Sequence, residues 1–206
     1  MNGVASKFED AEKGVASLKR FSVDKEKSRK FNIQTIMAYG SAFQMLEEGD
    51  YVKLYVDGVL MMSDTPMERR TNREFVSEAR GEVMIAGLGI GLILENLRDK
   101  VANGEVTRIV VYEKYQDVID LVYPKYADLP LEVRCADILE YKPLKDEVYD
   151  TIYFDIWPDI CEDNLPQMAM LHKRWARHKR KGGWMDSWMC RYLRNERRKS
   201  YGYGGW

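Results

Sequence analysis

The chain has 206 residues, enough for one domain with a sizeable core and a modest extension. Its 32 Lys and Arg residues against 33 Asp and Glu residues leave a formal net charge of -1, so overall charge points to no polyanionic partner. No stretch approaches the roughly 20 apolar residues of a membrane-spanning helix, and the polar start of the chain argues against a secretory signal.

Residues 1–50 are predicted to form an N-terminal extension that is partly ordered and partly helical. Residues 1–20 are small and charged, which favours partial order. After Asp24, a good N-cap residue, apolar side chains recur at helical spacing and predict one or two amphipathic helices. These apolar residues are Phe31, Ile33, Ile36, Met37, Phe43, Met45 and Leu46.

Residues 51–80 are predicted to form a β-hairpin and a capping helix. Two β-rich runs flank the Asp-Gly pair at 57–58, the strongest short signal for a hairpin. Thr65 is then the expected N-cap of a helix with Pro66 at its first position, and Glu68 closes a capping box. This helix is expected to end before Gly81, where the pattern changes.

Residues 81–190 alternate between short apolar strands and helices, which calls for a mostly parallel sheet covered on both faces. Strands are expected at 83–86, 108–112, 131–134, 151–154 and 184–188. Helices are expected at 90–101, 117–122 and 164–179, the last closed by the glycines at 182–183. The predicted fold is therefore α/β, a doubly wound Rossmann-like domain. Residues 191–206 are left as a basic and aromatic tail.

The first candidate site residues are the glycines of a turn between the first strand and helix, Gly87, Gly89 and Gly91. Glycines there let a ligand approach the backbone and the start of the helix. Glu113 ends the second strand, about 20 residues further on, where a carboxylate accepts hydrogen bonds from both ribose hydroxyls of a nucleoside.

Two further acids follow later strands. Asp137 comes directly after the third strand, where it can accept a hydrogen bond from an exocyclic amino group such as that of adenine. Asp155 comes at the end of the fourth. Because an open α/β sheet binds ligands at the carboxyl ends of its strands, we expect both acids in the same crevice as the glycine turn.

With these motifs, the stretch from about Tyr51 to Trp188 resembles class I S-adenosylmethionine-dependent methyltransferases of the spermidine-synthase-like kind. The resemblance implies S-adenosylmethionine, or its decarboxylated form, as cofactor. It also implies that Glu113 binds the ribose and that Asp137 lies on the adenine side. The strand-four acid, which often acts as a general base toward an amine in this family, corresponds to Asp155.

The chain departs from the aminopropyltransferase pattern. That pattern has Asp-x-x-Asp-Pro after the fourth strand, whereas residues 155–158 read Asp-Ile-Trp-Pro and the second acid is absent or displaced to Asp159. The Gln at the hairpin end is Met62 here. A polyamine site is therefore in doubt, and methyl transfer to an amine or other small nucleophile is favoured over aminopropyl transfer.

In this reading Asp155 anchors the acceptor or takes its proton, with Asp159 as a second anchor and Trp157 as a stacking wall. The methionine end of the cofactor needs partners for an ammonium and a carboxylate. The segment Ser63, Asp64 and Thr65 is a candidate, with Asp64 taking the ammonium and the free N–H groups of the helix start taking the carboxylate. Helix capping alone is the competing explanation.

Cysteines and histidines predict no metal site. Cys135, Cys161 and Cys190 lie far apart without a CxxC motif, which favours reduced thiols and a cytoplasmic location. His172 and His178 are spaced so that they do not share a helical face, and they are expected to be solvated.

Residues 172–200 are rich in Lys and Arg with interleaved aromatic side chains, which is compatible with a nucleic-acid-binding surface. A solvated charged face is the favoured interpretation. The corresponding alternative to an enzyme is a catalytically inactive protein that binds a nucleotide or interacts with nucleic acid. A small-molecule acceptor remains the expected partner, and a homo-oligomer is also open.

Overall fold

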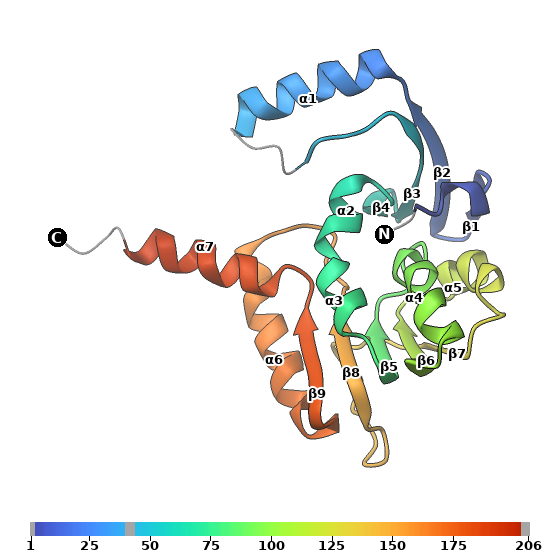
Figure 1. Cartoon of the computed structure of the whole chain (residues 1–206), viewed down its shortest axis with the longest axis vertical. Coiled ribbons are helices and arrows are strands. Elements are labelled where there is room, and N and C mark those ends of the chain that lie inside the picture. The colour runs from blue at the N-terminus through green and yellow to red at the C-terminus, as the bar shows by residue number, and fades with distance from the viewer. Residues whose placement is uncertain (1–2, 40–43, 203–206) are drawn as a thin grey trace.

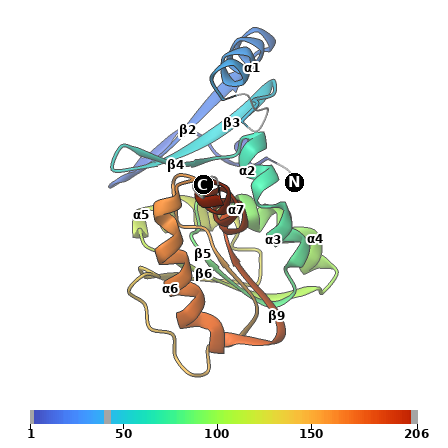
Figure 2. The same cartoon turned by 90° about the vertical axis from the view of Figure 1, so that its left-hand side faces the viewer.

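The computed structural model describes residues 3–39 and 44–202, and within these ranges the chain forms two β-sheets, one above the other (Figures 1 and 2). The lower one, in the described residues, is a five-stranded sheet in the order β7-β6-β5-β8-β9, with every neighbouring pair parallel. Its strands are β5 (Gly81–Ala86), β6 (Val106–Glu113), β7 (Leu131–Cys135), β8 (Tyr149–Phe154) and β9 (Lys179–Ser187). The α/β, Rossmann-like prediction is confirmed.

The order of these strands reverses between β5 and β8. The chain runs outward from β5 to β7, then crosses to β8 and continues to β9. In open α/β sheets such a reversal opens a crevice at the carboxyl ends of the strands, because the connections on its two sides leave in opposite directions. The predicted site residues of β5, β6 and β8 lie around this point.

Helices cover both faces of the parallel sheet (Figure 1). Successive side chains of β5 point to opposite faces of the sheet: Val83 and Ile85 belong to one buried cluster, and Met84 and Ala86 belong to another. The first cluster packs against α3 (Arg73–Glu78), α4 (Leu92–Ala102) and α5 (Gln116–Val122), and the second against α6 (Leu165–Trp175). Short 3-10 helices occur at Ala5–Lys7, Tyr123–Lys125, Glu162–Asn164 and Ala176–His178.

The upper sheet is antiparallel and corrects the prediction of partial order for the described part of residues 1–20, which begins at residue 3. Among the described residues it has four strands, β1 (Ala11–Lys13), β2 (Ala16–Val23), β3 (Gly49–Val56) and β4 (Val59–Ser63). Ala16 and Leu18 are buried while their neighbours are partly exposed, so β2 has the period-2 pattern of a strand. Partial order was the wrong expectation because β2 pairs with β3, a partner that local composition does not reveal.

The hairpin of β3 and β4 is confirmed. Asp57 and Gly58 both have positive φ, 50° and 75°, as a two-residue hairpin turn requires. The following helix is instead two short ones, α2 (Pro66–Thr71) and α3, separated by the buried Asn72. Thr65 makes no side-chain capping bond; its hydroxyl pairs with that of Ser63 at 3.1 Å.

The helix expected after Asp24 is α1 (Lys25–Tyr39), and Asp24 caps it by accepting a hydrogen bond from the Lys27 N–H at 2.8 Å. It does not bury an apolar face on the body, from which it projects at the top of Figure 1. The exposed side chains are Phe31, Ile33, Ile36 and Met37. Phe43, assigned to the same pattern, lies outside the described residues.

The C-terminal prediction needs two corrections. The glycines at 182–183 do not end a helix but lie inside β9, where a Cβ on Gly183 would be 2.5 Å from the Asp150 carbonyl oxygen. The predicted tail is largely helix α7 (Cys190–Gly202), held by the buried Cys190 and Leu193, and residues 203–206 lie outside the described part. Among the described helices, none is long and apolar enough to span a membrane.

Candidate functional site

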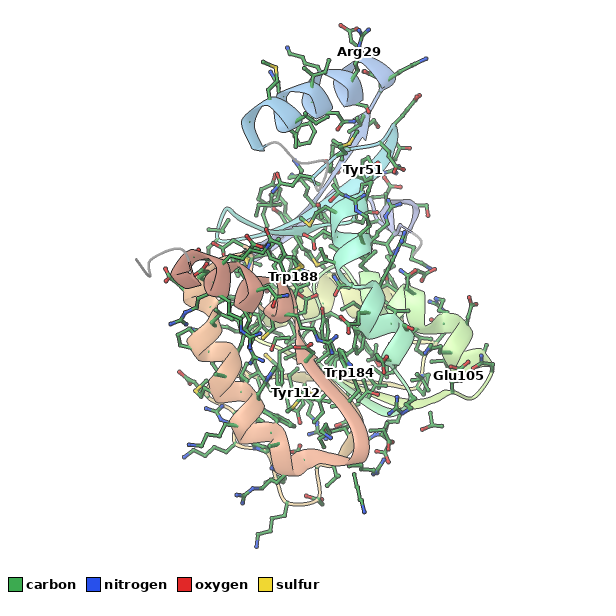
Figure 3. The ribbon with its side chains drawn as sticks, turned by 60° about the vertical axis from the view of Figure 1, so that its left-hand side comes forward. Arg29, Tyr51, Glu105, Tyr112, Trp184 and Trp188 are labelled. Atoms are coloured by element: carbon green, nitrogen blue, oxygen red, sulfur yellow. The ribbon has the colours of Figure 1, made fainter. Side chains whose placement is uncertain are left out.

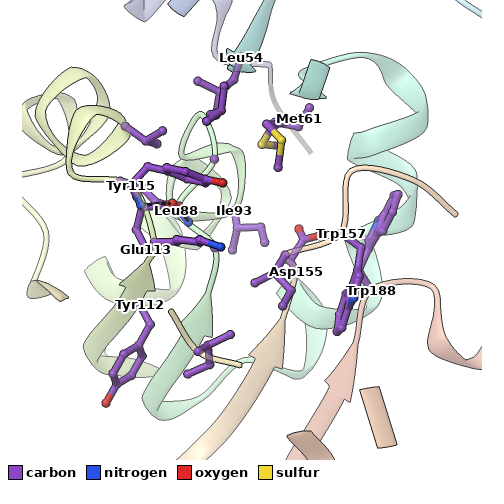
Figure 4. Close-up of a pocket in the computed structure, with 18 of the residues that line it drawn as sticks. Leu54, Met61, Leu88, Ile93, Tyr112, Glu113, Tyr115, Asp155, Trp157 and Trp188 are labelled. Atoms are coloured by element: carbon purple, nitrogen blue, oxygen red, sulfur yellow. Dashed lines mark hydrogen bonds between the residues drawn. The ribbon is translucent and has the colours of Figure 1, made fainter. Parts of the chain in front are cut away.

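A cavity of about 200 Å³ lies at the carboxyl edge of the parallel sheet, beneath the hairpin (Figure 4). The ends of β5, β6 and β8 and the loop after β7 form its floor and walls, and β3 and β4 supply Leu54, Val56, Met61 and Met62 above. Of the predicted site residues, those that line it are Gly87, Gly89, Glu113, Asp137, Asp155 and Trp157. The cavity is therefore at the strand ends that the sequence indicated.

The glycine turn is constrained by close packing. Gly87, Gly89 and Gly91 all have positive φ, at 97°, 51° and 70°. A Cβ on Gly87 would be 2.1 Å from the Asp155 carbonyl oxygen, and one on Gly89 would be 2.0 Å from the Met62 Sδ. The turn thus lies directly against the loop after β8 and against the hairpin. Gly91 packs on the Tyr126 ring and does not line the cavity.

Glu113 is buried and its carboxylate is oriented by the backbone. The Leu88 N–H donates to Oε2 at 2.9 Å and the Tyr115 N–H donates to Oε1 at 3.0 Å. Burial raises the pKa of Glu113, and these amide hydrogen bonds oppose the rise. The Lys114 and Gly89 amides also act on this carboxylate, so a diol in the cavity would share its oxygens with backbone donors.

Asp137 is held in the loop after β7. Its Oδ1 accepts a hydrogen bond from the Leu139 N–H at 2.9 Å, and its Oδ2 forms an ion pair with Lys114 at 3.1 Å. The Arg174 side chain of α6 braces the same loop by donating to the carbonyl oxygens of Ile138 and Leu139. Arg174 of the basic segment is therefore used in holding the fold together.

Asp155 lies at the end of β8, across the glycine turn from Glu113, as Figure 4 shows. Its backbone N–H donates to the Ala86 carbonyl at 2.8 Å, which holds the loop against β5. Burial raises the pKa of its carboxyl to about 7, and a hydrogen bond from the Asn72 side chain opposes the rise. This carboxyl can exchange a proton near neutral pH.

Glu68 of α2 also lines the cavity, and sequence reasoning missed it. Burial raises the pKa of Glu68 to about 8, the charge of Asp155 adds to the rise, and the Ser63 N–H opposes it. The sequence placed Glu68 in a capping box at the helix start. No local signal distinguishes it, because only the packing of α2 over the sheet brings it to Asp155.

Two tryptophans form walls near Asp155 (Figure 4). Trp157 is buried and its Nε1 donates to the Gln167 side chain at 2.8 Å. Trp188 directly follows β9 and lies beside α7 (Figure 3), and its Nε1 donates to the Thr71 hydroxyl at 2.9 Å. Both rings are thereby fixed in orientation, and Trp188 is a second site residue that the sequence did not identify.

Besides Gly91, the structure does not bring four more of the predicted residues to the cavity lining: Ser63, Asp64, Thr65 and Asp159. Asp64 is completely buried and accepts hydrogen bonds from the N–H groups of Val4, Ala5 and Val52 at 2.8, 3.0 and 2.8 Å. It joins the N-terminal segment to the hairpin, so the expectation that it takes a ligand ammonium is corrected. Asp159 is exposed and contacts the Asn164 side chain.

The histidines are not solvated as expected. The His178 side chain is buried, with Nδ1 2.8 Å from the Glu147 carbonyl oxygen, and the partly buried His172 has Nε2 2.8 Å from the Ser187 hydroxyl. Each therefore has a structural hydrogen-bond partner. Among residues 3–39 and 44–202, no group of three His, Cys, Asp or Glu side chains could hold a metal ion.

Comparison with known proteins gives only distant similarity. No protein-family model matches the chain, and no curated protein matches it. Solved structures that are similar include a S-adenosylmethionine-dependent methyltransferase from Leishmania major, at 15% identity and a TM-score of 0.44, matching 57% of this chain and 47% of the other. One from Geobacter sulfurreducens in complex with S-adenosyl-L-homocysteine has 18% identity, a TM-score of 0.42 and coverage of 58% and 46%.

A phosphoethanolamine N-methyltransferase from Haemonchus contortus matches 57% of this chain and 24% of its own length, at 11% identity and a TM-score of 0.44. This chain thus spans less than half the length of each of the three proteins. Scores this low decide neither family nor activity. The fold assignment rests on the strand order described above.

Proposed function

We propose that this chain binds S-adenosylmethionine and transfers its methyl group to an amine or other small nucleophile. The observation that carries the proposal is that one cavity is lined by Glu113 on one side of the glycine turn and by Asp155 on the other. In a sheet of this order, a nucleoside whose ribose binds the β6 acid directs its reactive end toward the end of β8.

The residues at the cofactor end suit a nucleoside. Gly87 and Gly89 let a ligand approach the backbone closely, and the oriented carboxylate of Glu113 offers acceptor sites for ribose hydroxyls. Asp137 lines the same cavity, which supports a contact with the adenine amino group, and Leu88 and Ile93 supply apolar contacts. The cofactor supplies a methyl group bonded to a positively charged sulfur, which makes that carbon electrophilic.

At the acceptor end, Asp155 anchors the nucleophile and takes its proton. An ammonium group gives a proton to the Asp155 carboxylate, and the freed nitrogen lone pair forms a bond to the methyl carbon. The bond from that carbon to sulfur breaks, and its electron pair stays on the sulfur. A carboxyl with a pKa of about 7 suits this exchange, because it is ionised in a large fraction of molecules at neutral pH.

Aminopropyl transfer from the decarboxylated cofactor, as in spermidine-synthase-like enzymes, is the second candidate. The observation in its favour is the charge of the described cavity lining. Four acids, Glu68, Glu113, Asp137 and Asp155, accompany one basic residue, Lys114, whose Nζ is paired with Asp137. A cofactor without a carboxylate needs no basic partner there.

Calorimetric titration of the purified protein with S-adenosylmethionine, its decarboxylated form, S-adenosylhomocysteine and NAD tests the proposal. Tighter binding of the carboxylated adenosyl ligands supports methyl transfer and leads to an acceptor screen with Asp155→Ala as control. Tighter binding of the decarboxylated form supports aminopropyl transfer. If no adenosyl ligand binds, both candidates are wrong.

A further inference from the structure

Glu68 and Asp155 reach the cavity from different parts of the fold. Glu68 comes from α2, the helix after the hairpin, whereas Asp155 follows β8 of the parallel sheet. The two carboxyls interact electrostatically, and both residues are partly buried. In Figure 4 the Asp155 side of the cavity also holds Trp157 and Trp188, whereas Glu113 and Tyr115 lie on the other side.

Asn72 joins the two elements that carry these acids. Its side-chain N–H group donates to the Glu68 carbonyl oxygen at 3.2 Å and to Asp155, and its Oδ1 accepts a hydrogen bond from the Tyr153 hydroxyl at 2.9 Å. Because Asn72 is completely buried, these contacts hold α2 and the end of β8 at a fixed separation. The carboxyl pair is thus part of a rigid frame.

No cation of the described cavity lining balances this pair. Lys114 is the basic residue among the lining residues, and its partner is Asp137 at the other end. The Tyr153 hydroxyl donates to Asn72, and the nearby acids Asp186 and Glu74 are already paired with Arg191. Two partly buried carboxyls without a counter-ion hold a proton readily, and they attract a cation.

We propose that Glu68 and Asp155 together form the acceptor subsite and that it takes an aliphatic amine in its ammonium form, with Trp157 and Trp188 flanking the alkyl chain. The assignment rests on the proposed transfer reaction and serves either the methyl or the aminopropyl version. Binding of the ammonium displaces the Glu68 proton to solvent, and Glu68 then holds the ammonium as a second carboxylate. This leaves Asp155 to accept the proton that must depart before the nitrogen attacks.

The pair also decides which acceptors are excluded. A carboxylate or phosphate acceptor adds negative charge beside two acids and is repelled. An alcohol of the same size carries no positive charge and cannot form an ion pair with the ionised carboxyl, so it binds more weakly than the amine. The subsite therefore discriminates by head group, and the indole rings tolerate variation in the apolar chain.

The test compares n-hexylamine, n-hexanol and hexanoate, which share one alkyl chain, by calorimetric titration of protein saturated with S-adenosylhomocysteine. We expect hexylamine to bind and the other two to bind at least about tenfold more weakly. Glu68→Gln should weaken hexylamine about tenfold or more while leaving the affinity for S-adenosylhomocysteine within about twofold. Glu78→Gln, the same change at a partly exposed position on α3, is the matched control.

Equal binding of hexanol and hexylamine, or unchanged hexylamine affinity in a folded Glu68→Gln protein, overturns the subsite assignment. Thermal unfolding of each variant confirms that it folds. If S-adenosylhomocysteine fails to bind the unmodified protein, the proposed transfer reaction is wrong. In that case hexylamine is titrated into the ligand-free unmodified protein and into ligand-free Glu68→Gln. Binding at least about tenfold weaker in the variant supports the carboxyl subsite, and equal binding overturns it.

Discussion

The Glu113 carboxylate accepts a hydrogen bond from the Leu88 N–H at 2.9 Å, so the acid at the end of β6 and the glycine turn after β5 hold each other in place. Loss of the carboxylate therefore affects both the ligand contact and the shape of the turn. Since the oxygens are already oriented, binding a diol requires little rearrangement. This arrangement leads to the first prediction.

Glu113→Gln should weaken S-adenosylhomocysteine binding about tenfold or more, because a charged acceptor becomes an amide whose N–H₂ group faces backbone donors. Calorimetry measures this change. The exposed Glu105→Gln substitution is the control and should leave affinity unchanged. Equal affinity of Glu113→Gln and the unmodified protein would show that the ribose does not bind at β6.

Three glycines with positive φ, one in the hairpin and two in the glycine turn, predict a graded loss of stability on substitution by alanine. Gly58→Ala meets no atom within 4 Å and should cost only the left-handed backbone strain, about 1–2 kcal/mol. Gly89→Ala adds a clash with the Met62 side chain, which can move. Gly87→Ala clashes with the Asp155 backbone, which cannot, so we expect the largest loss, above about 3 kcal/mol. Denaturant unfolding measures the order, and a Gly87→Ala protein as stable as Gly58→Ala contradicts it.

The carboxyl pair predicts how stability depends on pH. The pKa of Glu68 is raised from 4.5 to about 8 and that of Asp155 from 3.8 to about 7, so the folded chain binds these protons more tightly than the unfolded chain. Their contribution to stability is complete below the unfolded pKa values and is lost as pH rises through about 7 to 8.

Glu68→Gln removes one of these groups and should gain stability relative to the unmodified protein as pH rises, by about 4 kcal/mol between pH 5 and pH 9. The free energy of unfolding between about pH 5 and pH 9 measures the difference, in which titrating groups remote from the pair cancel. Glu78→Gln should leave the pH dependence unchanged. Parallel curves for Glu68→Gln and the unmodified protein would mean that Glu68 is well solvated.

Asp64 predicts a loss of stability without a loss of ligand affinity. Asp64→Asn replaces an acceptor for three buried backbone N–H groups, so we expect a loss of about 3 kcal/mol or more in unfolding free energy. The folded variant should bind S-adenosylhomocysteine as the unmodified protein does. Asp50→Asn, an exposed change on β3, is the control. Weaker ligand binding by a stable Asp64→Asn would restore its expected cofactor role.

The sequence by itself determined the features that depend on near neighbours. The Asp-Gly hairpin, the alternation of strands and helices, and the acids Glu113, Asp137 and Asp155 after successive strands follow from local patterns. Parallel strands end at one edge of a sheet, so side chains placed just after them converge whatever the details of packing. The positions of three acids and a glycine turn at one sheet edge therefore follow from the sequence alone.

Only the tertiary structure decided which residues complete the cavity and which are diverted from it. Asn72 of the α2 end accepts a hydrogen bond from Tyr153, 81 positions away, and this contact holds α2, with Glu68, against the end of β8. Asp64 accepts a hydrogen bond from the Val4 N–H, 60 positions away, and does not line the cavity. The order of residues 3–20 likewise depends on the pairing of β2 with the distant β3. No local periodicity records such contacts, because the energy that fixes them appears only when remote backbone and side-chain groups become buried together.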